Sequence, residues 1–319
     1  MSYRIVLPLA AALAAAAPAA AQNFPVKPVR LIVPFAPGGS TDIMGRILGQ
    51  KLSDMWGQQV VVDNRAGGGT IIGTEMAVNS PGDGYTLLLA NIALALNPGL
   101  HSRLPFDPVK DLAPVTLIAT QATAVAASPG FPANSVKELI AQAKAKTGGL
   151  SFGSSGTGGV GHIAGEMFRS AIGASMIHVP YKGGGPAAVD VMAGQIPLAF
   201  ISLPTVMTHY KAGKLKVLAV TDSKRSAAAP DIPTIGETIP GYAVNNWIGM
   251  LMPAKTTRPL IHKVNADVIK AIRLPDAKEK LSGQGFDIQG STPEEFGNMI
   301  RGDIAKYTKV IRQAGIKEN

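Results

Sequence analysis

The chain has 319 residues, with 30 lysines and arginines against 21 aspartates and glutamates, a formal net charge of +9 at pH 7, and no cysteine. The lack of cysteine excludes disulfides, thiolate metal sites and a cysteine nucleophile. The basic residues are dispersed, without a run of five and with little aromatic interleaving, which argues against nucleic-acid binding and favours either attraction of anionic solutes or solubility alone.

The N-terminus has the pattern of an export signal. Arg4 precedes an apolar run from Ile5 to Ala17, which is too short to span a bilayer comfortably. Ala19-Ala20-Ala21 then matches an A-x-A cleavage site. We therefore expect residues 1–21 to be a signal peptide, the mature chain to start at Gln22, and the protein to be periplasmic. A membrane anchor or a buried first helix is the alternative.

Strand and helix patterns alternate along the first part of the mature chain. Apolar spacing predicts strands over Val29–Phe35, Gln59–Val62 and Tyr85–Ala90, and helices over Ile43–Trp56 and Ile71–Asn79. This β-α-β-α-β order is typical of a mostly parallel sheet.

The pattern is interrupted and then begins again. A proline-rich loop is predicted at Pro105–Pro114, followed by one long extended segment, Val115–Ala127. Beyond it, the predicted helices are Val136–Lys146, Gly159–Ala171 and Pro186–Ala193, and the predicted strands are Leu150–Gly153, Met176–Val179, Leu198–Ser202 and Lys216–Val220. The remainder comprises a proline-rich stretch, Asp222–Tyr242, an extended segment, Trp247–Met252, and two predicted helices, Arg258–Ile272 and Pro293–Ala314.

Two β/α halves joined by two extended segments indicate an α/β protein with two lobes, each a mostly parallel sheet flanked by helices. We expect residues 22–120 plus 248–319 to form one lobe and residues 121–247 the other. The crossings near Val115–Ala122 and Asn246–Met252 would then form a hinge. A single large doubly wound domain is the alternative.

A glycine-rich and hydroxyl-rich junction follows the first predicted strand. It runs from Pro34 through Gly38-Gly39 to Ser40-Thr41-Asp42, just before a predicted helix. Ser40 or Thr41 is a suitable N-cap, and Asp42 suits the first turn of that helix. Capping alone does not require the preceding glycines, which let the backbone approach a ligand closely. The start of a helix after a strand is a common anion site, so we favour ligand binding here.

A second junction of the same kind, Gly153 to His162, lies more than a hundred residues later. It contains Gly156-x-Gly158-x-x-Gly161, which resembles a dinucleotide fingerprint. However, the next strand ends in Pro180-Tyr181-Lys182, without the acidic residue that would bind a ribose. Small-anion binding by the N–H groups of this loop therefore fits better, with the anion held between the two junctions.

A third glycine-rich junction, Tyr181 to Pro186, follows another predicted strand. Tyr181 could line a pocket, and Lys182 is expected to be solvated. The five histidines form no zinc-binding pair, and no G-x-S-x-G elbow is present. We expect no catalytic residue, metal site or cofactor.

Many motifs in the same order resemble the substrate-binding proteins of tripartite tricarboxylate transporters, the Bug family. The match covers nearly the whole mature chain. The motifs include Val33-Pro34-Phe35-Ala36-Pro37-Gly38-Gly39, Asn64-Arg65, Asp83-Gly84-Tyr85, Ser154-Ser155-Gly156, His178-Val179-Pro180-Tyr181-Lys182-Gly183 and Thr292-Pro293-Glu294-Glu295-Phe296.

The resemblance implies a two-lobed periplasmic binding protein of the Venus-flytrap type. It would hold one small carboxylate through main-chain N–H groups, hydroxyls and ordered water, and deliver it to integral membrane transporter subunits. A sensor protein is an alternative partner, and a monomer is expected. The expected ligand-binding residues are Phe35, Ala36, Gly38, Gly39, Ser40, Thr41, Asp42, Gly69, Thr70, Asn91, Ser154, Ser155, Gly156, Thr157, Gly158, His162, Tyr181 and Ser202.

One departure from the family pattern bears on the ligand. Many relatives carry an acidic residue near the end of the strand at Phe200, where this chain has Ile201-Ser202-Leu203. This difference favours a di-, tri- or aromatic carboxylate over an amino acid. The alternative function is an exported α/β enzyme acting on a small carboxylated or ester substrate.

Overall fold

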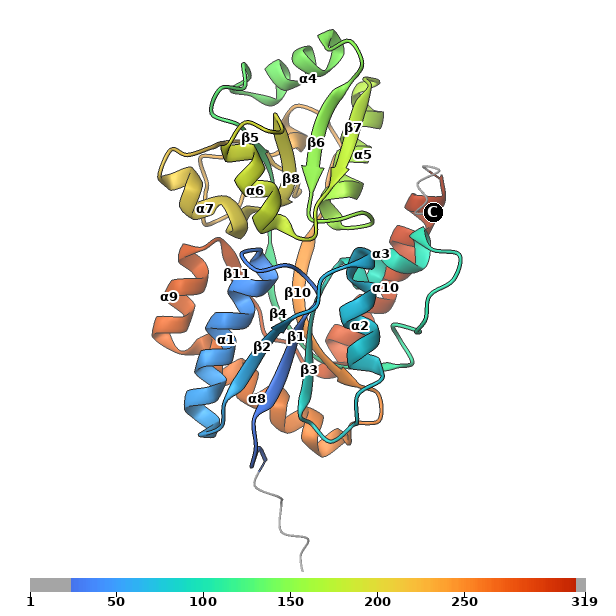
Figure 1. The fold of residues 1–319 in the computed structure, drawn as a ribbon, viewed down its shortest axis with the longest axis vertical. Helices are drawn as coiled ribbons and strands as arrows, with labels where there is room; N and C mark the ends of the chain where they lie inside the picture. The colour runs from blue at the N-terminus through green and yellow to red at the C-terminus, as the bar shows by residue number, and fades with distance from the viewer. Residues whose placement is uncertain (1–23, 314–319) are drawn as a thin grey trace, which may run out of the picture.

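The computed structural model describes residues 24–313, which fold into two α/β lobes (Figure 1). The first lobe contains a six-stranded sheet in the order β11-β4-β10-β3-β1-β2, and the second a five-stranded sheet in the order β7-β6-β8-β5-β9. The strands of the first sheet are β1 Val29–Val33, β2 Val60–Asn64, β3 Thr86–Asn91, β4 Leu112–Gln121, β10 Asn246–Pro253 and β11 Phe286–Ile288. Those of the second are β5 Thr123–Ala127, β6 Leu150–Ser154, β7 Met176–Pro180, β8 Leu198–Ser202 and β9 Lys216–Val220.

Helices cover both sheets. In the first lobe they are α1 Ser40–Trp56, α2 Ile71–Val78, α3 Ala93–Leu100, α8 Arg258–Arg273, α9 Pro275–Gly283 and α10 Pro293–Gln313. In the second they are α4 Val136–Ala145, α5 Val160–Ile172, α6 Gly184–Met192 and α7 Leu203–Lys211. Successive side chains of β1 point to opposite faces of the sheet. Leu31 and Val33 pack with α1 and α8, whereas Ile32 belongs to the core on the other face.

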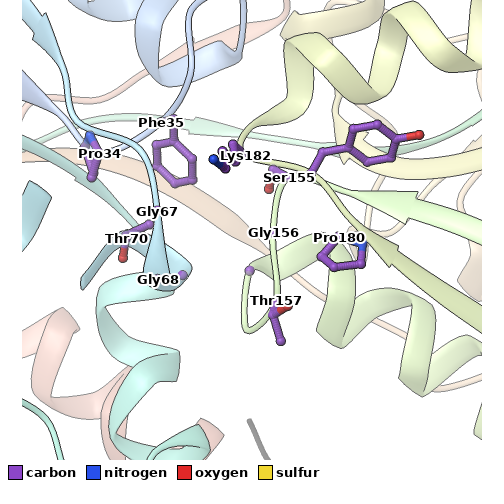
Figure 2. Close-up of a pocket in the computed structure, with 13 residues that line it drawn as sticks. Pro34, Phe35, Gly67, Gly68, Thr70, Ser155, Gly156, Thr157, Pro180 and Lys182 are labelled. Atoms are coloured by element: carbon purple, nitrogen blue, oxygen red, sulfur yellow. The ribbon is translucent and has the colours of Figure 1, made fainter. Parts of the chain in front are cut away.

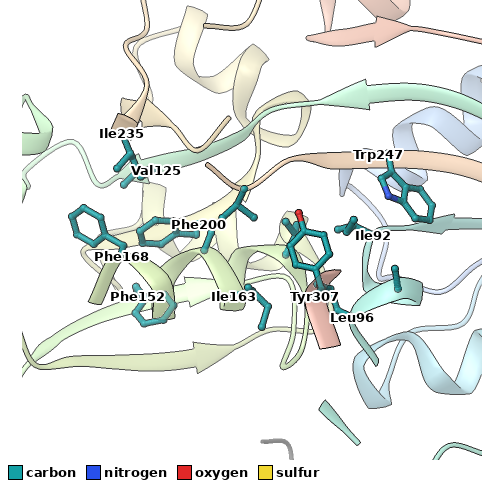
Figure 3. Close-up of a cluster of buried hydrophobic side chains, with 14 of the residues drawn as sticks. Ile92, Leu96, Val125, Phe152, Ile163, Phe168, Phe200, Ile235, Trp247 and Tyr307 are labelled. Carbon is teal, nitrogen blue, oxygen red and sulfur yellow. The ribbon is translucent and has the colours of Figure 1, made fainter. Parts of the chain in front are cut away.

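One buried core continues from lobe to lobe. Figure 3 shows Phe152, Phe168 and Phe200 of the second lobe in the same cluster as Leu96 and Trp247 of the first. The Trp247 indole N–H donates to Asp303 on α10 at 2.9 Å, so this large ring is buried with its polar atom satisfied.

The chain passes between the lobes at two places that lie side by side. The expected continuous segment Val115–Ala127 is in fact two strands, because Ala122 separates β4 from β5 and its carbonyl accepts the N–H of Leu203. The return strand β10 pairs with β4 as far as Asn246 opposite Gln121. Sheet membership supports the lobe boundaries given above, which we retain as a proposal.

The sheets are mostly parallel, as predicted, and one predicted loop ends differently. Most strands of each sheet run in one direction, but β10, β11 and β5 run against their neighbours, so every pairing that involves them is antiparallel. The loop predicted at Pro105–Pro114 is shorter than expected, because strand β4 begins at Leu112. Pro114 is tolerated there because it lies beside a register shift between Met250 and Leu251.

Candidate functional site

The two glycine-rich junctions face each other across the space between the lobes. One connects β1 to α1 and the other connects β6 to α5. Between them lies a cavity of about 200 Å3, which we call the outer compartment. Figure 2 shows Gly67, Gly68 and Thr70 on one side of it and Gly156 and Thr157 on the other. Its lining residues are Pro34, Phe35, Gly67, Gly68, Gly69, Thr70, Ser155, Gly156, Thr157, Gly159, Pro180, Tyr181 and Lys182.

A much smaller inner compartment of about 10 Å3 adjoins it. Its lining residues are Phe35, Gly39, Ser40, Thr41, Asn91, Ser155, Gly184, Ser202 and Thr205. Phe35 and Ser155 line both spaces and therefore stand at their boundary. A space of this size holds about one water molecule, so only the outer compartment has room for a solute.

The start of α1 differs from the sequence prediction. The N-cap is Gly39, with extended backbone at φ −83°, and Ser40 and Thr41 are already helical. Ser40 and Thr41 therefore do not cap the helix, and their hydroxyls form no hydrogen bond within the described chain. The Asp42 carboxylate accepts the N–H of Gly38 at 2.9 Å, which folds the loop back onto the first helical turn.

Asp42 shapes this junction and does not face the cavity. Its side chain is 3% exposed and also accepts Arg46 Nε at 2.9 Å and Asn64 Nδ2 at 3.0 Å. The hydrogen bond to Asp42 and the charge of Asp42 raise the pKa of Arg46, and the hydrogen bond is the larger cause. With its charge satisfied in this way, Asp42 positions the loop without repelling an anion.

The second junction is held by a buried network. The Ser154 hydroxyl donates to the carbonyl of Gly156 at 2.9 Å and lies 2.7 Å from His178 Nε2. His162 Nδ1 accepts the N–H of Gly158 at 3.1 Å, and its ring stacks on His178 with centroids 4.0 Å apart. Ser154 and His162 therefore use their polar atoms inside the protein, in support of the loop.

Burial of the two stacked histidines has a consequence for stability. Desolvation lowers the pKa of His162, and desolvation together with the neighbouring His162 lowers the pKa of His178 to about 3. As the pH falls below the ordinary histidine pKa near 6.5, the unfolded chain takes up protons that the folded chain refuses.

We expect the stabilising contribution of the two neutral histidines to be complete above about pH 6.5 and to fall below it, by up to about 1.4 kcal/mol per pH unit for each histidine. Chemical denaturation between pH 7 and pH 5 measures this slope. His178→Phe should reduce this slope, whereas Thr147→Ala, in the exposed turn after α4, is the control and should leave it unchanged. Equal slopes in the wild type and in His178→Phe would contradict the assignment.

Several main-chain donors at the cavity have no partner in the described chain. The N–H groups of Gly39, Ser155 and Thr157 form no hydrogen bond, and all three residues line one of the compartments. Gly156 between the latter two has φ +145°, which leaves it essentially restricted to glycine. The junctions thus present unsatisfied donors from both lobes to the space between them.

A left-handed turn forms the third wall. Gly68 and Gly69 have φ +52° and +56°, and Thr70 has φ +87°, a strained conformation for a β-branched residue. Asn97 on α3 holds this turn, because its Nδ2 donates to the carbonyl of Gly69 at 3.2 Å and to the Thr70 hydroxyl at 3.3 Å. Sequence reasoning missed Asn97, since a short apolar run containing Pro98 did not suggest helix α3.

Most of the expected site residues meet around the two compartments. Those that line one or both are Phe35, Gly39, Ser40, Thr41, Gly69, Thr70, Asn91, Ser155, Gly156, Thr157, Tyr181 and Ser202. Those that lie behind the lining are Ala36, Gly38, Asp42, Ser154, Gly158 and His162. Lining residues absent from the expected set include Pro34, Gly159, Pro180, Gly184 and Thr205.

Lys182 and Tyr181 differ in how they face the cavity. Lys182 is exposed and is the one charged residue among those lining the two compartments (Figure 2). The Tyr181 hydroxyl donates to Asp190 at 2.7 Å, and desolvation together with this bond raises its pKa to about 12. Tyr181 therefore offers the cavity its ring and leaves its hydroxyl bound elsewhere.

A second cavity of about 430 Å3 lies beside the two crossings between the lobes. Its lining includes Asp222, Asp287 and Asp303 together with Lys224, Arg225 and Lys306. Burial raises the pKa of all three carboxyl groups and is the largest cause of each shift. The pKa of Asp222 rises to about 7. The outer compartment has no acidic side chain in its lining and is therefore the better match for a carboxylate.

Two features that would indicate other kinds of function are absent from residues 24–313. No helix there is both long and apolar enough to cross a bilayer. No group of three or more histidine, aspartate or glutamate side chains in that range could hold a metal ion.

Comparison with known proteins places these features in a family. Residues 44–316 match the model of the tripartite tricarboxylate transporter family receptor. The chain belongs to this receptor family. The protein BugT of Bordetella pertussis is 35% identical over 305 residues, covering 95% of this chain and 94% of BugT.

Solved structures of similar proteins share the fold. A periplasmic transporter matches with a TM-score of 0.89 and 41% identity, over 92% of this chain and 99% of that one. R. palustris Rpa4515 with adipate matches with a TM-score of 0.88 and 31% identity, over 92% of this chain and 98% of that one. This receptor is therefore a two-lobed periplasmic solute-binding protein, and the alternative of an exported enzyme is set aside.

Proposed function

We propose that this receptor binds one small di-, tri- or aromatic carboxylate in the outer compartment, with one carboxylate oxygen in the inner compartment, and delivers it to the membrane subunits of a tripartite tricarboxylate transporter. The observation that carries the proposal is the set of unpartnered N–H groups of Gly39, Ser155 and Thr157 around the two adjoining compartments. Donors without partners favour an anion, and the start of a helix adds a partial positive charge.

Two further observations support a carboxylate as the anion. The residues lining the two compartments include one cation, Lys182, and no acidic side chain. The similar protein Rpa4515 has been solved with adipate. The first experiment is a thermal-shift series of mono-, di- and tricarboxylates, in which a ligand at a hundred times its Kd adds about 2.7 kcal/mol of stability. Stabilisation by none of them would contradict the proposal.

The ligand's affinity should depend on hydroxyls of both lobes. Thr41→Ala and Ser155→Ala should each weaken binding roughly tenfold to hundredfold, because a hydrogen bond to a charged group contributes about 1.5–3 kcal/mol. Lys182→Ala should have a smaller effect, since its ammonium is exposed to water. Titration calorimetry with the carboxylate that stabilises the wild type measures all three.

Thr147→Ala, in an exposed turn after α4, is the matched control and should bind as the wild type does. Loss of binding in Lys182→Ala together with normal binding in both hydroxyl variants would mean that a salt bridge holds the anion.

We also propose that the protein is exported and cleaved near Ala21, in keeping with the periplasmic location of its relatives. The signal peptide lies outside the described residues. Intact-mass measurement of the periplasmic protein should give a chain that begins at Gln22 or within a residue or two of it. A full-length chain in the membrane fraction would contradict cleavage.

A further inference from the structure

The third glycine-rich junction, Gly183-Gly184-Gly185, supplies none of the donors of the proposed grip on a ligand, although Gly184 lines the inner compartment. It lies between β7 and α6 of the second lobe, and Gly183 and Gly184 are buried. The atoms nearest to where side chains would project at Gly183 and Gly185 belong to residues 36–38 of the first lobe. The segment therefore packs against the opposite lobe.

Two hydrogen bonds cross between the lobes beside this segment. The N–H of Ala36 donates to the carbonyl of Lys182 at 2.8 Å. The N–H of Ser40, in the first turn of α1, donates to the hydroxyl oxygen of Thr205 on α7 at 2.9 Å. Ser40 and Thr205 are 5% and 6% exposed, so this bond is shielded from water.

Gly185 shows that the contact between lobes, and not the local backbone, requires glycine. It lies within α6 and outside the left-handed region, so its own lobe would accept alanine, which is the better helix former. A Cβ at Gly185 would instead lie 2.6 Å from the carbonyl oxygen of Pro37 and 3.0 Å from the carbonyl carbon of Gly38. A side chain of any size at residue 185 is therefore incompatible with this arrangement of the lobes.

We propose that Gly183–Gly185 and Thr205 form a latch that holds the two lobes closed through contacts within the chain itself. The latch gives the closed arrangement stability that no ligand has to supply. Because only the closed arrangement brings both junctions to one cavity, weakening the latch lowers the fraction of binding-competent protein and raises the apparent Kd in proportion.

The test begins with the ligand-free protein in solution. Small-angle X-ray scattering of the wild type should give the radius of gyration of the closed arrangement, and Gly185→Val should give a larger one. Gly130→Val, at an exposed glycine of the same lobe with open space around its Cβ position, is the matched control and should match the wild type. Circular dichroism establishes that each variant is folded, and Gly185→Ala replaces the valine variant if that one is not.

Thr205 provides a second and independent measurement. Thr205→Val removes the acceptor of the Ser40 N–H and should speed hydrogen exchange of that amide at least tenfold, whereas Thr205→Ser keeps the acceptor and should preserve protection. Adipate serves as the ligand probe, and its apparent Kd should rise in Gly185→Val and stay the same in Gly130→Val.

An open wild type, or a Gly185→Val variant as compact as the wild type, would overturn the latch. So would equal exchange at Ser40 in Thr205→Val and Thr205→Ser. Scattering and exchange need no ligand, so failure of any carboxylate to bind would count against the proposed function and leave these results standing.

Discussion

Replacing Gly161 by alanine is expected to lower the free energy of unfolding by about 3 kcal/mol. Gly161 lies in the first turn of α5, where a Cβ would be 1.9 Å from the carbonyl oxygen of Phe200 on β8. The backbone cannot yield there without separating the helix from the sheet. Since α5 follows the second junction, the displacement should also move Ser155 and Thr157. Denaturant titration of the variant measures the loss of stability.

Gly302 provides the matched control, because it also lies in a helix but has open space around its Cβ position. Gly302→Ala should therefore raise the free energy of unfolding by about 0.5–1 kcal/mol, the usual gain for alanine over glycine in a helix. Opposite signs at these two helical glycines would show that packing decides the effect. Equal stability of Gly161→Ala and the wild type would mean that α5 does not approach β8 so closely.

Replacing Gly156 by valine is expected to reduce ligand affinity more than a hundredfold. A φ of +145° is open to glycine and strained for valine, and the new Cβ would also lie 3.2 Å from the carbonyl oxygen of Tyr181. The loop must change conformation, and the N–H groups of Ser155 and Thr157 then no longer point toward the ligand. Two hydrogen bonds to a charge, each of about 1.5–3 kcal/mol, account for an effect of this size.

Gly173→Val is the control that distinguishes the effect of backbone strain from the loss of contacts with the ligand. Gly173 ends α5 in the left-handed conformation with open space around it, so valine there introduces backbone strain away from the cavity. It should lower the melting temperature while leaving the Kd of the stabilising carboxylate near that of the wild type. Titration calorimetry that found normal affinity for Gly156→Val would remove the second junction from the site.

The regular strands and long amphipathic helices could be predicted from the sequence because their apolar spacing is a local property. The pattern of Ile47, Leu48 and Leu52 in α1 is one example, and the buried run of β3 is another. The glycine-rich junctions were predicted for the same reason, since glycine after a strand and before a helix signals a close approach of backbone.

Contacts between distant segments could not be predicted in this way. Helix α7 was not predicted, although Pro204 is well suited to the first turn of a helix. Helix α9 and strand β11 were also missed, as a short charged stretch and a three-residue strand carry little periodic signal. His162 and Asp42 were expected to contact the ligand. Their side chains instead accept hydrogen bonds from the N–H groups of Gly158 and Gly38, which no local sequence pattern shows.

The order of strands in the first sheet also sets the order in which the sheet can be completed. β3 has all six of its residues buried, and its partner on one side is β10, which begins at Asn246. Every strand of the second sheet, by contrast, lies within residues 123–220. A nascent chain thus holds all of the second sheet before it holds the centre of the first. Until residue 246 and those after it are available, β3 presents an apolar open edge, the kind of surface on which strands of other chains pair.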